Sequence, residues 1–359
     1  MKKEKRRFRF KKISKLTILI FLMDLMVISG LVVIHTDEFK SFWIPTAMTT
    51  MRHKYLAYTL YDEDTVNKVM SEDYIEQYDE AIDLDEIVIG NIKEKSYYTN
   101  KYEQELFTRD PGNEVYKTIR IVEPRFKGWL IAVYDPADID LAVTAKIGRM
   151  GQSVNTLVKN TPGGLVGMNG GGFEDLDGWG NGSIPYGAII QDGKLIWNHS
   201  GGFGNLIGFT KDHKMYITTK SPEEAIADGM WDAVDFGPVL ILNGKTAKIH
   251  GHGGWGYAPR SIIAQRKDGV VLLLIIEGRL PGYSIGASMN EAIEVLLRYK
   301  AYNAANLDGG ASSTMSIEGK LWNRACAGGE YGGRTVSNAW IVTNLQNKPA
   351  QAPVKSNYK

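Results

Sequence analysis

The stretch that decides the fold is Asp268-Gly-Val-Val-Leu-Leu-Leu-Ile-Ile-Glu277, a turn dipeptide followed by an unbroken apolar run. A run of this length without a polar residue is typical of a strand that is buried on both faces. Asp-Gly supplies the positive φ angles of a tight hairpin turn. Residues 270–276 therefore predict a central strand of a sheet-based domain.

The same turn signal recurs at three other places, each between apolar or alternating runs: Asp192-Gly193, Asn243-Gly244 and Glu318-Gly319. Together these dipeptides predict at least three antiparallel hairpins. Residues 118–122 and 129–134 also have the β-branched and aromatic composition of strands.

One helix is clearly predicted. Ser288 and Glu291 have the spacing of a capping box. The residues that would lie on one side of the helix after this cap are Met289, Ala292, Leu296, Tyr299 and Asn303. The fold class predicted for the main domain is α+β, a strand-rich mixed or antiparallel sheet with a few packed helices.

The N-terminus predicts a membrane anchor. Residues 16–34 form a largely apolar run with Asp24 as its one charged residue, and nine Lys and Arg residues precede them. Nineteen residues at helical rise just span a bilayer core. The basic flank predicts a single-pass helix with its N-terminus in the cytoplasm and the rest of the chain outside. A cleaved signal peptide is the alternative, but no small-residue cleavage site follows His35.

Composition divides the chain into four parts. Residues 1–36 form the basic tail and the anchor, and residues 37–101 are acidic and are predicted to form a helical stalk, with an amphipathic helix over residues 64–82. The glycine-rich main domain is predicted over residues 102–345, and a flexible tail over residues 346–359.

Several function classes do not fit these patterns. The folded part has no basic face for nucleic acid, because the excess of Lys and Arg is confined to the N-terminus. Gly244-Lys245-Thr246 lacks the first glycine of a P-loop, since that position is Val239. His250 and His252, with His199, could ligate a metal, but a glycine-rich loop is the favoured interpretation. The sequence thus indicates no cofactor and no metal.

Three polar, glycine-dense segments follow strand-like runs, where scaffolds present reactive side chains. They are residues 167–173, residues 259–261 with 277–279, and residues 306–314. Their order and wording, over roughly residues 115–345, resemble the phosphodiester glycosidase family. This family includes N-acetylglucosamine-1-phosphodiester alpha-N-acetylglucosaminidases and bacterial exopolysaccharide biosynthesis proteins. The motifs that carry the resemblance are Asn169-Gly170-Gly171, Pro259-Arg260-Ser261, Glu277-Gly278-Arg279, Asn306-Leu307-Asp308-Gly309-Gly310-Ala311-Ser312-Ser313 and Arg334-Thr-Val-Ser-Asn338.

The resemblance implies a hydrolase that cleaves a sugar-1-phosphodiester at the anomeric carbon, in a cell-surface glycan or exopolysaccharide. Asp308 and Glu277 are the candidate catalytic carboxylates. The candidates for binding the sugar or the phosphate are Arg260, Arg279, Arg334, Asn169, Gly170, Gly171, Gly309, Gly310, Ser312, Ser313 and Asn338. The chain departs from the family at Glu277, where an Asp is usual, and at Ala311, where a Gly is usual.

Alternatives remain open for these residues. Asp308 could cap a turn, and Glu277 could form a structural ion pair with Arg279. The domain could be a non-catalytic glycan or wall-polymer binding module, or a metal-dependent phosphodiesterase. Four aromatic residues in loops among the motifs could stack on sugar rings or simply pack: Trp179, Tyr186, Trp255 and Tyr257.

Overall fold

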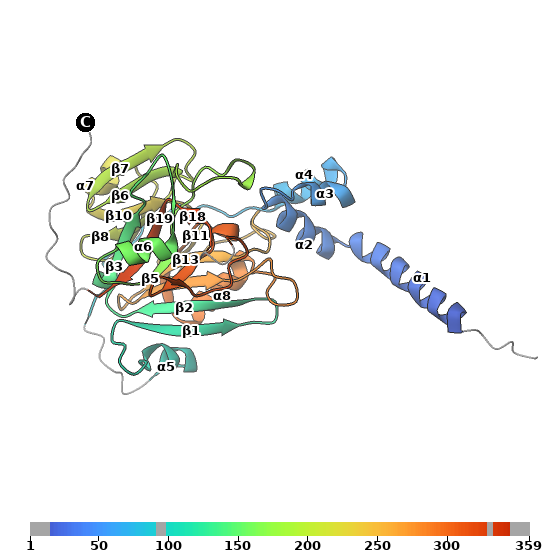
Figure 1. Ribbon diagram of the computed structural model, residues 1–359, viewed down its shortest axis with the longest axis horizontal. Helices are drawn as coiled ribbons and strands as arrows, with labels where there is room; N and C mark the ends of the chain where they lie inside the picture. The colour runs from blue at the N-terminus through green and yellow to red at the C-terminus, as the bar shows by residue number, and fades with distance from the viewer. Residues whose placement is uncertain (1–14, 91–97, 329–332, 345–359) are drawn as a thin grey trace, which may run out of the picture.

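The computed structural model describes residues 15–90, 98–328 and 333–344. Residues 1–14 of the basic tail and the tail predicted over residues 346–359 lie outside the described residues. The long helix α1 (Lys15–Ile34) projects from the rest of the molecule, and three shorter helices follow it at the edge of the main domain (Figure 1). These are α2 (Asp37–Met48), α3 (Tyr55–Leu60) and α4 (Glu63–Glu72). They pack around Ile44, Ala57 and Val66 and form a small core of their own.

Helix α1 exposes apolar side chains along its length, including Phe21 and Met26 at 65% and 69% exposure. Within the described residues, no one helix has both the length and the apolar character to cross a membrane by itself. Ile18–Ile34 and Asp37–Met48 meet both requirements only when they are taken together, and this pair is bent by 73°. The bend lies at Thr36, whose side chain caps α2 by accepting from the backbone N–H of Phe39.

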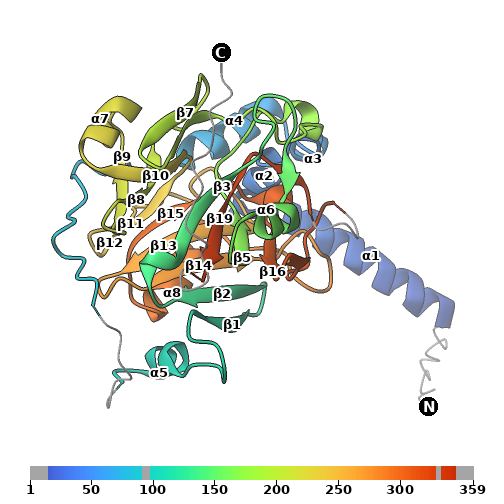
Figure 2. The ribbon, with the colours of Figure 1, turned by 60° about the vertical axis from the view of Figure 1, so that its left-hand side comes forward.

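Residues 73–90, here called the strap, run in an extended conformation across the main domain (Figure 2). The helix predicted over residues 64–82 is therefore correct for α4 and wrong beyond it. Ile75 forms a β-bridge with Ile249, and the Tyr78 hydroxyl donates hydrogen bonds to two carbonyl oxygens of the domain. An isolated short helix is marginal in water. Burying Ile75 and Tyr78 against the domain outweighs the weak helical pattern.

A seven-stranded sheet forms the centre of the main domain, in the order β1-β2-β14-β13-β15-β11-β12 with all neighbours antiparallel. Its strands are β1 (Tyr116–Val122), β2 (Lys127–Val133), β11 (Val239–Leu242), β12 (Lys245–Thr246), β13 (Arg260–Arg266), β14 (Val271–Ile276) and β15 (Ala301–Asn306). β14 is the predicted central strand. Leu272 and Leu274 face one core, while Val271 and Leu273 face another, which confirms burial on both faces.

Two five-stranded antiparallel sheets share one core with the same face of the central sheet. The first has the order β7-β6-β10-β8-β9, with β6 (Gly187–Gln191), β7 (Lys194–His199), β8 (Leu206–Thr210), β9 (Met215–Thr218) and β10 (Met230–Asp235). The second has the order β17-β16-β5-β19-β3, with β3 (Ile139–Val143), β5 (Gly164–Asn169), β16 (Met315–Ile317), β17 (Lys320–Leu321) and β19 (Asn338–Thr343). A short pair joins β4 (Gln152–Ser153) to β18 (Thr335–Val336).

Helices cover the outer faces of these sheets. The opposite face of the central sheet packs on α5 (Lys101–Phe107) and α8 (Met289–Arg298). α6 (Val154–Asn160) covers the sheet that contains β5, and α7 (Pro222–Ala227) covers the sheet that contains β6. The α+β, strand-rich prediction is confirmed.

The four predicted turns all connect antiparallel strands, namely β6–β7, β11–β12, β13–β14 and β16–β17. Asn243 and Gly244 illustrate the cause, because their φ angles of 53° and 75° are the two positive values that this kind of turn requires. The capping box at Ser288 and Glu291 is also present. The helix ends at Arg298, however, and Asn303 belongs to β15 because Lys300 at φ 60° turns the chain into that strand.

Candidate active site

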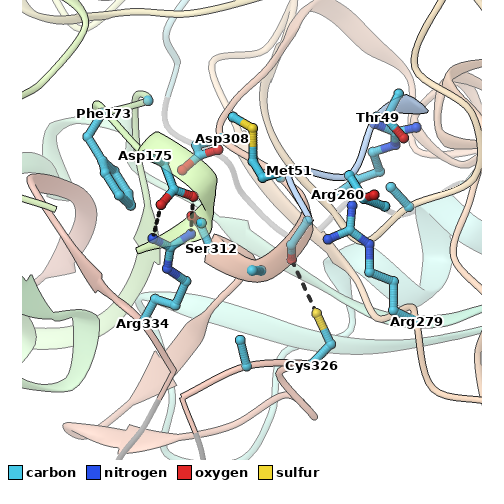
Figure 3. Close-up of a pocket in the computed structure, with 18 of the residues that line it drawn as sticks. Thr49, Met51, Phe173, Asp175, Arg260, Arg279, Asp308, Ser312, Cys326 and Arg334 are labelled. Carbon is cyan, nitrogen blue, oxygen red and sulfur yellow. Dashed lines mark hydrogen bonds and ion pairs between the residues drawn. The ribbon is translucent and has the colours of Figure 1, made fainter. Parts of the chain in front are cut away.

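Seven of the predicted site residues line one cavity of about 550 Å³, here called the arginine cavity: Arg260, Arg279, Arg334, Asp308, Gly309, Gly310 and Ser312. Asp308, Asp175 and Arg334 gather on one side of it, while Arg260 and Arg279 lie on the other (Figure 3). The structure thus brings together side chains from segments that are far apart in the sequence.

Asp308 reaches this cavity because its main chain is fixed where β15 ends. Its backbone N–H donates to the carbonyl oxygen of Gly170 at 3.0 Å, and its own carbonyl oxygen accepts from Nδ2 of Asn169 at 2.6 Å. The chain then turns through a short 3₁₀ helix, η3 (Gly310–Ser312). With both backbone groups occupied, the carboxyl group is left to line the cavity.

The Asp308 carboxyl group has a strongly perturbed pKa. Burial raises the pKa to about 7, against the opposing effects of a hydrogen bond from Ser312 and the charges of Arg334 and Arg279. A carboxyl group that titrates near neutral pH can take up or release a proton during a reaction.

Arg279 is the cation that most clearly faces the cavity. Its φ of 57° is unusual for a residue with a side chain and costs on the order of 1–2 kcal/mol. Within the described residues, its guanidinium has no hydrogen bond or ion pair, although the charge of Asp308 acts on it. The residue as a whole is exposed, but partial desolvation of its guanidinium in the cavity lowers the pKa of Arg279.

Arg260 is held more firmly. Nε donates to the carbonyl oxygen of Ala287 at 3.0 Å, and Nη2 donates to the carbonyl oxygens of Trp255 and Gly256 at 2.8 and 2.5 Å. Burial, and then the nearby charge of Arg279, lowers the pKa of Arg260. The buried Arg260 and the nearby Arg279 together create a positive potential in the cavity.

Arg334 is engaged by an acidic partner that the sequence did not single out. Its Nη1 and Nη2 bond Oδ2 and Oδ1 of Asp175 at 2.6 and 2.8 Å, and Nη2 also donates to the carbonyl oxygen of Gly180. Despite burial, the hydrogen bonds and charge of Arg334 lower the pKa of Asp175. Arg334 therefore supplies a matched pair and not an unbalanced positive charge.

Glu277, the second candidate catalytic carboxylate, is not among the described residues that line the cavity. Its Oε2 accepts from Arg120 at 3.1 Å and from the Tyr283 hydroxyl at 2.8 Å, and its Oε1 accepts from the backbone N–H of Arg324. The carboxylate is 1% exposed. This position does not fit the predicted catalytic role, and the ion pair it forms is with Arg120 and not with Arg279.

Five of the predicted binding residues also lie behind the described cavity wall: Asn169, Gly170, Gly171, Ser313 and Asn338. Asn169 is fully buried, and its Oδ1 accepts from Ser261 and from the backbone of Thr314. Asn338 accepts from the backbone N–H of Gly171 at 2.8 Å. A side chain at Gly170 would collide with Asn338. These residues position the loops that carry Asp308 and do not fit direct contact with a substrate.

Other cavity residues were not predicted from the motifs. The segment Thr49-Thr-Met-Arg-His53, between α2 and α3, forms part of the wall. Arg52 donates to the carbonyl oxygen of Gly178 at 2.6 Å and stacks over Trp179 at 4.0 Å. Phe203, Phe236 and Cys326 also line the cavity, as do Tyr186 and Trp255. Trp179 and Tyr257 are not among its described lining residues.

The histidines considered as metal ligands are engaged elsewhere. His250 stacks on Tyr74 at 4.3 Å and bonds Glu76 at 2.9 Å. Across residues 15–90, 98–328 and 333–344, no group of three or more His, Cys, Asp or Glu side chains is placed to hold a metal ion.

An arginine-lined cavity with a titratable carboxyl group at the end of a strand is suited to binding an anion. The family model for phosphodiester glycosidases matches residues 162–343, which contain all the arginines and the carboxyl groups just described apart from Arg52 and Arg120. This is about half of the chain, and the chain belongs to the phosphodiester glycosidase family.

Similar solved structures exist. The catalytic domain of zebrafish N-acetylglucosamine-1-phosphodiester alpha-N-acetylglucosaminidase, auto-inhibited by its pro-peptide, has a TM-score of 0.53 and 21% identity, over 66% of this chain and 85% of that chain. A protein from Burkholderia pseudomallei has a TM-score of 0.46 and 16% identity, over 61% and 74% of the two chains. A protein from Synechocystis has a TM-score of 0.45 and 16% identity, over 63% and 61%. The zebrafish structure establishes a shared fold. No curated protein matches this chain.

Proposed function

We propose that the chain is a hydrolase that cleaves a sugar-1-phosphodiester by breaking the C–O bond at the anomeric carbon. The observation that supports this best is Arg279, a guanidinium that lines the cavity, has no hydrogen bond or ion pair within the described residues, and lies close enough to Asp308 to interact with its charge. A phosphate diester would supply the anion that this cation lacks.

The overall charge of the cavity supports the same substrate class. Among the described residues that line it are four arginines (Arg52, Arg260, Arg279 and Arg334) and two carboxyl groups (Asp175 and Asp308). Asp175 is already matched by Arg334. The remaining excess is positive, and it favours an anion even when Asp308 is ionised.

The proposed reaction needs little from a general acid, because a phosphate monoester leaves as a stable anion. Arg279 and Arg260 hold the phosphate and stabilise the negative charge that develops on the departing oxygen. Asp308, as the carboxylate, takes a proton from the water whose oxygen attacks the anomeric carbon. One C–O bond forms, one breaks, and the phosphate monoester leaves.

The test is hydrolysis of an alkyl diester of a sugar 1-phosphate by the full chain in detergent, in water labelled with heavy oxygen. Label in the sugar product supports the proposal. Label in the phosphate would mean that the P–O bond breaks, and it would replace the glycosidase with a phosphodiesterase. The rate with and without a chelator separates a metal-dependent reaction from the proposed one.

We also propose that α1 anchors the chain in the cell membrane, with the basic N-terminus in the cytoplasm and the catalytic domain outside. The exposed apolar surface of α1 and the preceding basic residues support this topology. An outward-facing site would act on a cell-surface glycan or an exopolysaccharide. Protease added to intact cells should digest the domain, and protection of the domain would contradict the topology.

A further inference from the structure

A second cavity, of about 860 Å³, lies against the strap and is here called the strap cavity. Strap residues such as Ile75 and Tyr78 form one wall, and the ends of β9 and β11 contribute Thr218 and Val239. Phe203 and Trp255 line both this cavity and the arginine cavity. Their ring centroids are 6.0 Å apart. The two cavities therefore meet at one pair of aromatic rings.

Phe203 is an exposed ring on a fixed backbone. Its side chain is 44% exposed, yet its N–H donates to Oδ1 of Asp235 at 2.6 Å and the next N–H, of Gly204, donates to Oδ2 at 3.3 Å. Asp235 itself is only 7% exposed. Burial raises the pKa of Asp235, against these bonds, so the loop is held at a cost in desolvation. Rigid aromatic rings at a cavity mouth are suited to stacking on the apolar face of a ligand ring.

The strap cavity has the opposite charge from the arginine cavity. Its lining includes Asp73, Glu76, Asp79, Glu80 and Asp228, against Lys220. Three of these carboxylates form ion pairs with lysines: Asp228 with Lys220, Glu80 with Lys245 and Glu76 with Lys248. Asp73 and Asp79 have no ion pair within the described residues. Asp73 is 7% exposed, and its Oδ2 is buried without a hydrogen-bond partner in the described part of the chain. The remaining charge, from Asp73 and Asp79, is negative, and a phosphate group in this cavity would be repelled by it.

We propose that the strap cavity binds an uncharged oligosaccharide that continues from the phosphate held in the arginine cavity. The inference rests on the proposed function and names its substrate class. One phosphate sits at the bond that is cleaved, neutral sugars follow it across Phe203 and Trp255, and a polymer with a phosphate in every unit is disfavoured. The cavity volume is within the range of ligand pockets, roughly 300–1,000 Å³.

The test compares three diesters of one sugar 1-phosphate, which carry a methyl group, a neutral trisaccharide, or the same trisaccharide with an added phosphate. We expect kcat/KM to be at least about tenfold higher for the neutral trisaccharide than for the methyl ester. The phosphorylated trisaccharide should fall below the neutral one. Equal values for all three diesters, or a preference for the phosphorylated one, would overturn the proposal.

A cavity-filling variant provides the matched test. Thr218→Trp should reduce kcat/KM for the neutral trisaccharide to the value of the methyl ester and leave the methyl ester unchanged. Thr108→Trp, at an exposed position after α5, is the control and should change neither. An unchanged trisaccharide preference in Thr218→Trp would also contradict the assignment.

A binding measurement tests the glycan site independently of the proposed reaction. Calorimetry with the full-length Asp308→Asn variant should give a Kd for the neutral trisaccharide diester about tenfold lower than for the methyl diester. If none of the diesters is hydrolysed by the unmodified chain but this difference is found, the proposed reaction fails and the glycan site stands. If the methyl diester is hydrolysed and no difference is found, the glycan site fails and the reaction stands.

Discussion

Arg334 and Asp175 form a two-pronged ion pair across 159 positions of sequence, with both oxygen–nitrogen distances below 3 Å. The side chains are 14% and 12% exposed. Of the three arginines predicted from the motifs, Arg334 is thus the one whose charge is balanced by a carboxylate, and its loss should have a different effect from the loss of Arg279.

Arg334→Ala should lower stability. The substitution leaves the Asp175 carboxylate mostly buried without its cation, which costs about 3 kcal/mol in the free energy of unfolding. Urea unfolding measures the change. Asp175→Asn combined with Arg334→Ala should recover part of the loss, because no unpaired charge remains. A single variant as stable as the original chain would contradict the pairing.

Arg279→Ala should lower activity and leave stability intact. The guanidinium has no partner to lose within the described residues, and its removal relieves Arg260. We expect kcat/KM on a sugar-1-phosphodiester to fall by about a hundredfold, as for the loss of one electrostatic donor. Arg279→Lys should recover only part, because a point charge cannot reproduce the planar fork. Arg324→Ala is the control, because Arg324 is exposed and is not among the described residues that line the cavity.

Asp308→Asn should abolish turnover, preserve binding and raise stability at neutral pH. The folded-state pKa of about 7 lies above the ordinary value of 3.8, so the folded chain binds a proton that the unfolded chain releases. Stability of the unmodified chain then falls as pH rises from about 4 to about 7 and is level above that. The variant does not undergo this decrease in the free energy of unfolding, which is on the order of 2–4 kcal/mol above pH 7. Thermal unfolding at pH 5 and pH 8 measures the difference, and an equal Tm for both chains at pH 8 would contradict the raised pKa.

The pH dependence of turnover tests the direction of proton transfer. If Asp308 accepts a proton from water, kcat/KM rises with pH through about 7, because the carboxylate is the active form. The rate of methyl diester hydrolysis between pH 5 and pH 9 gives this profile. A rate that falls through the same range would make Asp308 a proton donor instead.

Arg52→Ala should loosen the cavity wall built by the segment between α2 and α3. The variant loses the hydrogen bond to the Gly178 carbonyl and the stacking on Trp179. We expect faster amide hydrogen exchange at residues 49–53 and 176–180 and a several-fold higher KM, with a small change in kcat. Lys54→Ala, at the next basic residue, should change neither quantity.

Much of the architecture could be predicted because local rules and tertiary demands agree. At residues 268–277, the turn dipeptide, the apolar run and the buried strand all point to the same structure. The strap is the counter-example. Residues 73–82 carry a weak helical pattern, but Ile75 and Tyr78 gain more by packing on the domain than a solvent-exposed helix would.

The site was predictable only in part, for a similar reason. Asp308 and Arg279 stand next to glycines at strand ends, which marks them as presented side chains. Asp175 has no such signature, since its role is to pair with Arg334, which is distant in the sequence and comes near only in the folded chain. Glu277 has the right chemistry and motif, but its side chain points to Arg120 and Tyr283. The direction of a side chain is set by packing that no local pattern encodes.

The wall built by residues 49–53 has a consequence for how a tethered enzyme would work. Only α2 separates α1 from that wall. The Tyr61 hydroxyl, directly after α3, donates to the carbonyl oxygen of Ile34 at the end of α1 at 2.6 Å and so ties the two helices together. In the proposed anchored state, the surface that holds α1 would therefore also aim the mouth of the reaction chamber. The anchor would then set both the location of the enzyme and the distance from the membrane at which it can act. It would cleave glycans whose phosphodiester bond comes close to the membrane near the anchor, and it would leave bonds farther from the membrane intact.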